Sequence, residues 1–302
     1  MNLISQIKEI KKKVSGQILF KENLSKYSWF NLGGPAKVVF KPKSLNELSI
    51  FLKGLKGFNQ IKVLGAGSNT LIRDAGFNGV IIKLGKSFSH ISLLNQNMII
   101  VGASALDRNV SNFAHENSLS GFEFLSCIPG TIGGGIRMNS GCYGNDISKI
   151  LVSVQTIDFT GNARVIYSSD IKFSYRNCNL ENGLIFLSAT FRGNNDNNQN
   201  IRKKINSLVE RKKKEQPSKI KTCGSTFKNP ENNKAWSLIK DSGCAGMKVG
   251  DAHISEKHCN FFVNKGNAKS KDLENLIYQV KKKVLNKTGI KLELELEIIG
   301  EN

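Results

Sequence analysis

Apolar residues recur along this chain in two patterns, one with a spacing of three to four residues and one with strict alternation. Over residues 37–102 the two patterns follow each other and predict the order β-α-β-loop-β. Residues 150–191 consist almost entirely of strand patterns, and residues 201–302 mix both kinds. Helical and strand-rich stretches are therefore partly segregated along the chain.

Local signals mark the ends of several elements. Residues 44–47 (SLNE) form a capping box that begins a helix, Ser270 is placed to cap the last long helix, and Gly289 to end it. Gly161-Asn162 is typical of a hairpin turn. The predicted helices cover residues 1–14, 44–57, 106–117, 201–216, 235–241 and 270–289. The predicted strands cover residues 37–41, 61–64, 79–84, 98–102, 150–159, 163–167, 171–175, 184–191, 260–264 and 292–298.

Composition narrows the class of protein. With 302 residues and 39% hydrophobic content the chain can bury a sizeable core, and no apolar run reaches the ~20 residues that span a bilayer. The N-terminus lacks the apolar core of a signal peptide, which favours a cytosolic protein. Six cysteines without a C-x-x-C pair indicate reduced thiols, and we expect no metal site. The net charge of +20 suits either a nucleic acid or an anionic small substrate.

Two glycine-rich segments carry the first candidate chemistry. Ile128–Gly144 holds six glycines in seventeen residues, and Gly133-Gly134-Gly135 removes three side chains in succession. Bare successive amides can form an anion-binding nest, although flexible turns have the same composition. Leu64–Leu71 follows an apolar strand and again combines glycines with small polar side chains. Two such loops suit one extended ligand with a pyrophosphate in its middle.

Three further positions carry reactive groups. Glu293, Glu295 and Glu297 share one face of the last predicted strand, where they either face solvent or supply one useful carboxylate. Ser225 lies between small residues without the surroundings of a hydrolase nucleophile, so its hydroxyl is either a proton donor or a turn residue. Arg176 follows an aromatic pair and either binds a carboxylate or stacks at the surface.

Seven segments in this order resemble the UDP-N-acetylenolpyruvoylglucosamine reductase (MurB) family, over about Leu24 to Gly300. The segments are Trp29–Ala36, Gly65–Asn69, Ile128–Gly144, Tyr175-Arg176, Gly224–Pro230, Ser255–His258 and Leu292–Gly300. Each is weak alone, and their combination is specific. The absence of a long insertion after Arg176 is similar to the shorter of the two family types.

The resemblance implies a fold, a cofactor and a reaction. It implies an α+β fold with a two-part FAD-binding domain of the vanillyl-alcohol-oxidase type over residues 1–195, with subdomains at about 1–85 and 86–195. An α+β substrate-binding domain would follow over 201–302. The polar run Gly193–Asn200 is the predicted linker between the two domains. FAD, reduced by NADPH, would convert UDP-N-acetylglucosamine enolpyruvate to UDP-N-acetylmuramate for peptidoglycan. A cytoplasmic monomer without nucleic-acid or membrane partners is expected.

The resemblance also assigns roles to residues. Ser225 would be the proton donor, while Arg176 and Glu295 would polarise the enolpyruvyl carboxylate. The residues expected to bind FAD are Gly65, Ala66, Gly67, Ser68, Asn69, Ile128, Gly130, Thr131, Gly133 and Gly134. Those expected to bind substrate are Arg211, Lys228 and Asn229.

Glu297 departs from the family pattern in charge, and two other classes of protein would explain part of the sequence. Glu297 stands where the family usually has a basic residue, so its charge is expected to raise the pKa of Glu295 or its own. Another flavoenzyme on the same FAD-binding fold would explain both glycine loops but not Ser225 with Arg176 and Glu295. A basic nucleic-acid-binding protein would place aromatics among its basic residues on one face, whereas the phenylalanines here occupy mainly core positions.

Overall fold

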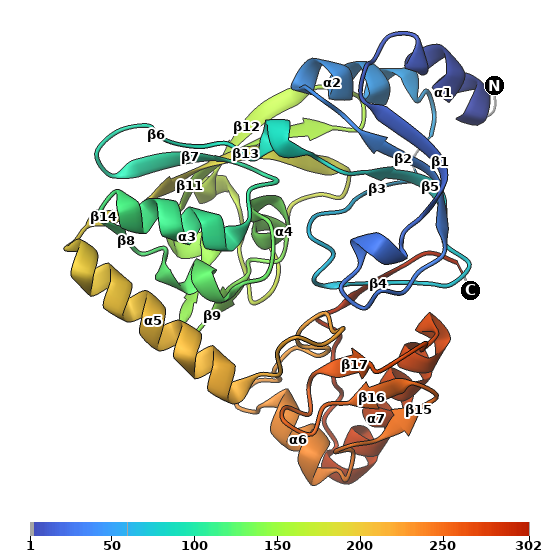
Figure 1. Cartoon of the computed structure of the whole chain (residues 1–302), viewed down its shortest axis with the longest axis vertical. Helices are drawn as coiled ribbons and strands as arrows, with labels where there is room; N and C mark the ends of the chain where they lie inside the picture. The colour runs from blue at the N-terminus through green and yellow to red at the C-terminus, as the bar shows by residue number, and fades with distance from the viewer. Residues whose placement is uncertain (1–2, 59, 302) are drawn as a thin grey trace. The chain divides into compact units, whose positions relative to one another are not determined.

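The computed structural model describes residues 3–58 and 60–301 (Figure 1). The chain forms two compact units. Unit 1 consists of Met1–Phe20, Val38–Ala66 and Gly79–Arg211, and unit 2 of Lys21–Lys37, Gly67–Asn78 and Lys212–Asn302. Two segments from the first third of the chain therefore belong with the C-terminal residues. The functional division into 1–195 and 201–302 stays a prediction.

The helices and strands alternate irregularly along the chain. The helices are α1 (Leu3–Lys11), α2 (Leu45–Gly54), α3 (Asp107–Glu116), α4 (Ile132–Arg137), α5 (Asn198–Glu215), α6 (Ala235–Asp241) and α7 (Ser270–Thr288). The strands up to the second glycine segment are β1 (Gln17–Asn23), β2 (Pro35–Lys41), β3 (Ile61–Val63), β4 (Thr70–Ile72), β5 (Phe77–Ile82), β6 (Ile91–Leu93), β7 (Met98–Gly102) and β8 (Leu119–Ser120). The later strands are β9 (Gly141–Cys142), β10 (Asn145–Asp146), β11 (Leu151–Asp158), β12 (Ala163–Tyr167), β13 (Leu184–Arg192), β14 (Asn194–Asn195), β15 (Lys248–Val249), β16 (Ala252–Ile254), β17 (Phe262–Asn264) and β18 (Glu297–Ile299).

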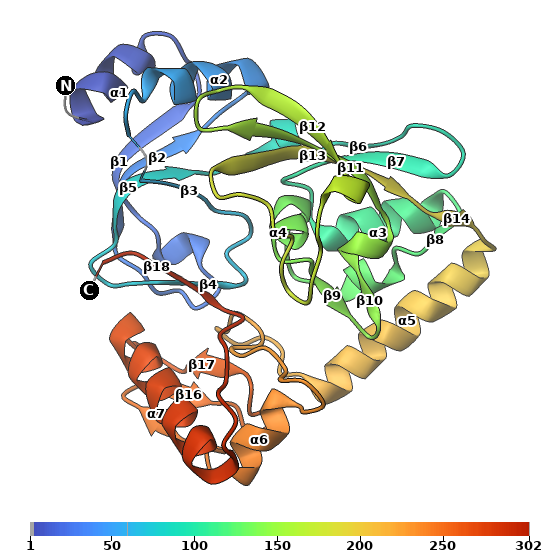
Figure 2. The ribbon, with the colours of Figure 1, turned by 180° about the vertical axis from the view of Figure 1, so that it is seen from behind.

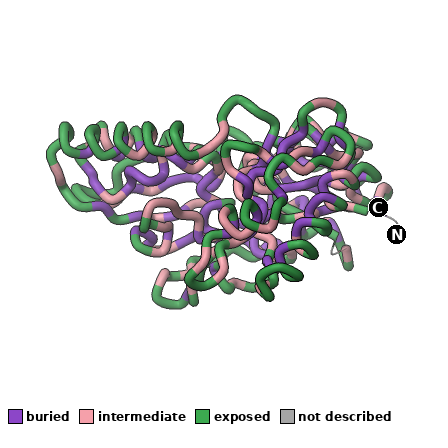
Figure 3. The backbone as a smooth tube through the Cα atoms, turned by 90° about the horizontal axis from the view of Figure 1, so that it is seen from below, coloured by how far each residue is buried: buried purple, intermediate pink, exposed green. Residues whose placement is uncertain are grey.

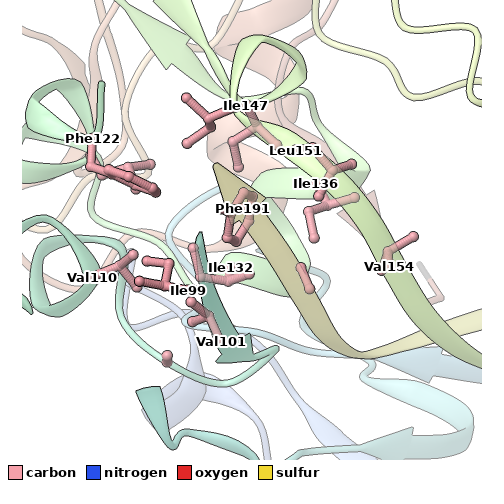
Figure 4. Close-up of a cluster of buried hydrophobic side chains, with 14 of the residues drawn as sticks. Ile99, Val101, Val110, Phe122, Ile132, Ile136, Ile147, Leu151, Val154 and Phe191 are labelled. Atoms are coloured by element: carbon pink, nitrogen blue, oxygen red, sulfur yellow. The ribbon is translucent and has the colours of Figure 1, made fainter. Parts of the chain in front are cut away.

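Unit 1 contains a five-stranded antiparallel sheet with the order β12-β11-β13-β7-β6. One core joins this sheet to α3 and α4, and Figure 4 shows Ile132 and Ile136 of α4 among its buried side chains. A second core joins α1 and α2 to the other side of β13. Phe186 and Ala189 both face the first core although three positions separate them. The register shift between β11 and β13 near Leu187 explains this, because a bulge turns the following residues to the opposite face.

Unit 2 is held by α7 and α6 around the antiparallel sheet β15-β16-β17. Strand β18 pairs in parallel with β4, so the chain's last strand lies beside the strand that follows the first glycine segment (Figure 2). Arg73, just after β4, donates two hydrogen bonds of 2.9 and 2.8 Å to the carboxylate of Glu274 in α7. Bidentate pairs of this kind fix orientation as well as contributing energy.

Buried, intermediate and exposed residues alternate along the backbone (Figure 3). Strands β4 and β17 are wholly buried, whereas β12 is largely exposed. In α7 the buried side is the predicted apolar stripe, which consists of Leu273, Leu276, Ile277, Val280 and Val284. Gly289 adopts the left-handed conformation after α7, as predicted. Glu47 N–H donates to the Ser44 hydroxyl at 3.2 Å, which confirms that cap at the start of α2.

Several sequence-based expectations were wrong. Residues 171–175 form no strand, and the predicted linker Gly193–Asn200 contains β14 and the first turn of α5. Ser270 does not cap α7, since its hydroxyl accepts a hydrogen bond from the backbone N–H of Asp74. The alternation over 292–298 gives a ladder only at β18. The first two residues of the helix expected at 1–14 lie outside the described residues.

Candidate active site

The first glycine segment touches the second within unit 1. A Cβ atom on Gly65 would lie 2.6 Å from the hydroxyl oxygen of Thr131, so only glycine allows the two segments this approach. The ammonium of Lys83 donates to the Gly65 carbonyl. Burial lowers the pKa of Lys83, and neighbouring Lys41 lowers it further. The hydrogen bond holds the Lys83 side chain beside the point where the two segments meet, although its surroundings disfavour the charged form.

Gly67, Ser68 and Asn69 belong to unit 2 and are held by backbone contacts there. Gly67 has a φ of +70°, and its carbonyl accepts a hydrogen bond from the Trp29 N–H at 3.1 Å. The Cys223 thiol lies 3.5 Å from the same carbonyl, and burial raises the pKa of this thiol to about 11. Cys223 is thus an uncharged packing residue that joins the first glycine segment to the residues before Ser225.

Replacing Gly67 by alanine is expected to destabilise unit 2 strongly. The new Cβ would lie 1.8 Å from the Tyr27 carbonyl oxygen, on a backbone with φ of +70°. Gly243→Ala is a matched control because Gly243 has a φ of +68° but no atom within 4 Å of the added Cβ. We expect a loss of about 1 kcal/mol for the control and at least about 3 kcal/mol for Gly67→Ala in urea unfolding. Equal losses would show that the close approach to Tyr27 is unimportant.

The second glycine segment folds into a short helix instead of an open loop. Its glycines allow close packing, because Cβ atoms on Gly133 and Gly135 would lie 3.2 Å from Ala103 and 2.6 Å from Ile147. The Gly133 N–H donates to the Ala103 carbonyl, and the Gly135 N–H donates to the Thr131 carbonyl. Because two of these amides are bonded within the protein, residues 133–135 form neither a nest of three free amides nor a flexible turn. Gly134 is exposed and Ile128 and Gly130 are half-buried, so this part of the segment remains accessible.

Arg176 lies against the end of the second glycine segment, also within unit 1. Its guanidinium donates to the Gly141 carbonyl at 3.0 Å and lies 4.9 Å from the centre of the Tyr175 ring. The backbone of Arg176 has a φ of +59°, which costs energy for any residue other than glycine. Asn139 holds the same turn through a 3.2 Å hydrogen bond to the Ser174 carbonyl.

Arg211, at the far end of α5, approaches the same region of unit 1. Its guanidinium carbon lies 4.5 Å from the centre of the Tyr143 ring. Tyr143 lies between β9 and β10, the small hairpin that begins at Gly141. The structure therefore brings both predicted arginines, Arg176 and Arg211, to one hairpin.

Ser225 and Glu295 are neighbours within unit 2. The Glu295 N–H donates to the carbonyl of Thr226 at 3.0 Å, and Phe227 bridges to Leu294 in antiparallel fashion. Asn69 donates from its side chain to the Glu295 carbonyl at 2.9 Å. The hydroxyl-bearing segment, the carboxylate-bearing segment and the first glycine segment thus share one backbone network.

Lys228 and Asn229 continue the Ser225 segment. The Lys228 ammonium lies 3.7 Å from the carboxylate of Glu293, and its backbone N–H donates to the Glu293 carbonyl. The side-chain oxygen of Asn229 accepts a hydrogen bond from the Ala235 N–H at the start of α6. Asn229 therefore has a structural role in addition to the substrate contact predicted for it.

A hydroxyl and a carboxylate on adjacent backbone segments suit proton transfer, and a fixed guanidinium suits binding of a carboxylate. Across residues 3–58 and 60–301, no three histidine, cysteine, aspartate or glutamate side chains are grouped so that they could hold a metal ion. None of the described helices is both long and apolar enough to cross a bilayer.

The chain is similar to known proteins over almost its whole length. A family model described as the C-terminal domain of UDP-N-acetylenolpyruvoylglucosamine reductase matches residues 216–299, and one described as an FAD binding domain matches residues 36–166. A protein named UDP-N-acetylenolpyruvoylglucosamine reductase from Pelagibacter ubique is 50% identical over 299 residues, covering 98% of this chain and 99% of that protein. The chain belongs to the UDP-N-acetylenolpyruvoylglucosamine reductase family.

Other members of the reductase family extend the match. The protein of the same name from Rickettsia conorii is 45% identical over 96% of this chain and 98% of its own length. The crystal structure of the reductase from Thermus caldophilus has 30% sequence identity and a TM-score of 0.82, covering 94% of this chain and 99% of that chain. The predicted α+β fold with an FAD-binding domain is confirmed, and FAD is the cofactor.

Sequence reasoning missed three residues that this member of the reductase family places around its glycine segments. Lys83 is the polar end of an apolar strand, Asn139 has a left-handed backbone with φ of +40°, and Asp107 is a fully buried carboxyl beside Gly130. The only signal for Lys83 was a charge inside an apolar run. Asp107 looked like an ordinary acidic residue at a helix start.

Proposed function

We propose that this chain reduces UDP-N-acetylglucosamine enolpyruvate to UDP-N-acetylmuramate with NADPH, in the synthesis of peptidoglycan precursors. The observation that carries this proposal is the 50% identity to a reductase of that name over almost the whole of both chains. The adjacency of the Ser225 and Glu295 segments supports it independently, because the reaction needs a proton donor beside a carboxylate-binding group.

Two glycine segments are proposed to hold the cofactor. The residues present fit FAD because Gly65 and Thr131 meet where any larger side chain would fill the space, with Lys83 beside them to balance negative charge. Gly65–Asn69 would take one side of the dinucleotide, and Ile128, Gly130, Thr131, Gly133 and Gly134 the other. Once reduced by NADPH, bound FAD supplies the hydride that adds to C3 of the enolpyruvyl group.

The chain's own residues complete the reaction. We assign Ser225 to deliver a proton to C2 of the enolpyruvyl group, which balances the hydride added at C3. Arg176 and Glu295 are assigned to the enolpyruvyl carboxylate, where negative charge grows as the double bond is reduced. Arg176 is suited to this by its planar, permanently charged guanidinium. Glu295 is half-buried and held through its backbone by Thr226 and Asn69.

Three residues are proposed for the uridine diphosphate end of the substrate. Arg211 and Lys228 supply positive charge for the phosphates. Asn229, whose side-chain oxygen accepts a hydrogen bond from the Ala235 N–H, is assigned to the same end of the substrate through its side-chain amide. We keep the predicted division of labour, with residues 1–195 binding FAD and 201–302 binding substrate. The cytoplasmic location and the monomeric state also stay predictions.

The function is tested by following the flavin colour without oxygen. We expect the purified protein to be yellow, to bleach when NADPH is added, and to regain its colour when UDP-N-acetylglucosamine enolpyruvate follows. A protein that bleaches but ignores the enolpyruvyl substrate would be a different flavoenzyme. A colourless protein that takes up no FAD would contradict the proposal altogether.

A further inference from the structure

A carboxyl group without a charged partner is buried at the start of α3. The side chain of Asp107 has no exposed surface, and neither of its oxygens makes a hydrogen bond of ordinary geometry among the described residues. An isolated buried carboxylate is costly because it gives up its hydration without compensation. Burial accordingly raises the pKa of Asp107 to about 8, and the nearby Gly130 amide offsets this only in part. The carboxyl is therefore mainly neutral at pH 7.

This carboxyl lies directly against the second glycine segment. One oxygen is 2.6 Å from the position of a Cβ on Gly130, and the other is 3.5 Å from that on Gly135. The Asp107 backbone N–H donates to the Gly130 carbonyl at 3.2 Å, and Leu106 bridges to Thr131. Both the backbone and the side chain of Asp107 thus support the segment proposed to bind FAD.

Charged groups on the neighbouring elements are engaged elsewhere. His115 lies two turns further along α3. Glu123, in the short helix η3 (Glu123–Cys127), has its carboxylate 3.7 Å from the Lys204 ammonium. Arg137 of α4 donates to backbone carbonyls at residues 180, 181 and 184. Residues 98–106 and 128–136 contain no titratable side chain, and Cys127 directly precedes the second of these ranges. Burial and the Gly130 amide are the influences that act on the Asp107 carboxyl, and no opposite charge among the described residues compensates its ionised form.

We propose that Asp107 is a positioning residue for FAD, whose neutral carboxyl supports the second glycine segment and whose ionisation weakens cofactor binding. The inference rests on the proposed role of Gly130–Gly134. The pyrophosphate of FAD is anionic, and repulsion between like charges is strong where water is excluded. FAD therefore binds preferentially to the protonated form of Asp107, and its binding above the pKa of the free protein takes up a proton.

The same group makes the stability of the free protein depend on pH. Between its ordinary pKa of 3.8 and the raised value of about 8, the folded chain keeps a proton that the unfolded chain has lost. Stability from this group is therefore greatest at low pH and falls as pH rises through this range. Asp107→Asn has the same shape and no titration, so its melting temperature is expected to fall less steeply with pH.

The test measures the dissociation constant of FAD between about pH 6.5 and 9 for the wild type and Asp107→Asn. For the wild type, the constant should rise by up to roughly tenfold per pH unit above about pH 8, and this rise should vanish in Asp107→Asn. Glu116→Gln removes an exposed charge from the same helix and should follow the wild type. The titration of FAD itself is common to all three. Parallel profiles for the wild type and Asp107→Asn would overturn the proposal.

A second measurement needs only the wild-type protein and so does not depend on how the variant folds. Calorimetry of FAD binding near pH 8, in buffers of different ionisation enthalpy, counts the protons taken up. We expect net uptake, and no uptake or a release would overturn the role of Asp107. Failure of the wild type to bind FAD at any of these pH values would count against the proposed function instead.

Discussion

Replacing Ser225 by alanine is expected to give a yellow protein that NADPH still bleaches but that reduces its substrate about 10²–10⁴-fold more slowly, the usual contribution of a positioned proton donor. Ser225 is half-buried, and its backbone is paired with Phe261, a contact that alanine retains. The fold and the FAD site should therefore survive. Stopped-flow measurement separates the two half-reactions, and only reoxidation of the flavin by the enolpyruvyl substrate should slow.

Two further variants make the Ser225 result specific. Ser237→Ala removes an exposed hydroxyl of α6 that donates to Asp241 and should leave both half-reactions unchanged. Ser225→Cys keeps a dissociable proton in the same place and should recover part of the lost rate. If Ser225→Ala reoxidised at the wild-type rate, another group would have to deliver the proton, and the assignment of Ser225 would be wrong.

The elements that could be predicted are those specified by their own residues. The helix α6 was predicted over the residues that form it, and the apolar stripe of α7 and the left-handed Gly289 followed from local spacing. The capping box at Ser44 was right about its serine but incomplete. The carboxylate of Glu47 accepts hydrogen bonds from the backbone of Ser15 and Gly16, a long-range contact that no spacing rule predicts.

The elements that could not be predicted depend on distant partners. Local propensity argues against a helix in Ile132–Arg137, where three glycines follow one another. The helix α4 forms because those glycines allow contact with Ala103 and Ile147, which are remote in sequence. Conversely, the alternation of apolar and acidic residues over 292–298 predicted a long strand. Only Glu297–Ile299 finds a partner in β4, while Leu294 makes a single bridge to Phe227.

The candidate site likewise has features that the sequence predicts and features that only the fold creates. The order of its motifs was enough to predict the family, because seven weak signals in one sequence are jointly specific. The neighbourhood of Ser225 and Glu295 could not follow from spacing, since it depends on pairing between the segments around Phe227 and Leu294. Asp107 was not predicted as a functional residue because its raised pKa depends on burial, which is a property of the folded chain.

Changing Arg176 to lysine is expected to lower the rate of substrate reduction by about 10²–10³-fold, comparable to losing one donor at a developing negative charge. Lysine keeps the positive charge but loses the planar fork that matches a carboxylate. The left-handed backbone, with φ of +59°, gives a separate reason to expect a function here. Such a conformation is costly for any residue other than glycine and persists where the surroundings, here Asn139 and Gly141, impose it.

The backbone strain at Arg176 is the same for lysine, so the comparison isolates the guanidinium. Arg164→Lys serves as the matched control because Arg164 forms an exposed ion pair with Glu181, and exposed pairs contribute little. We expect Arg176→Lys to bind FAD and to be reduced by NADPH normally, with its defect confined to reoxidation by the enolpyruvyl substrate. A defect that appeared equally in flavin reduction, or equally in Arg164→Lys, would show that Arg176 acts through the fold and not on the substrate carboxylate.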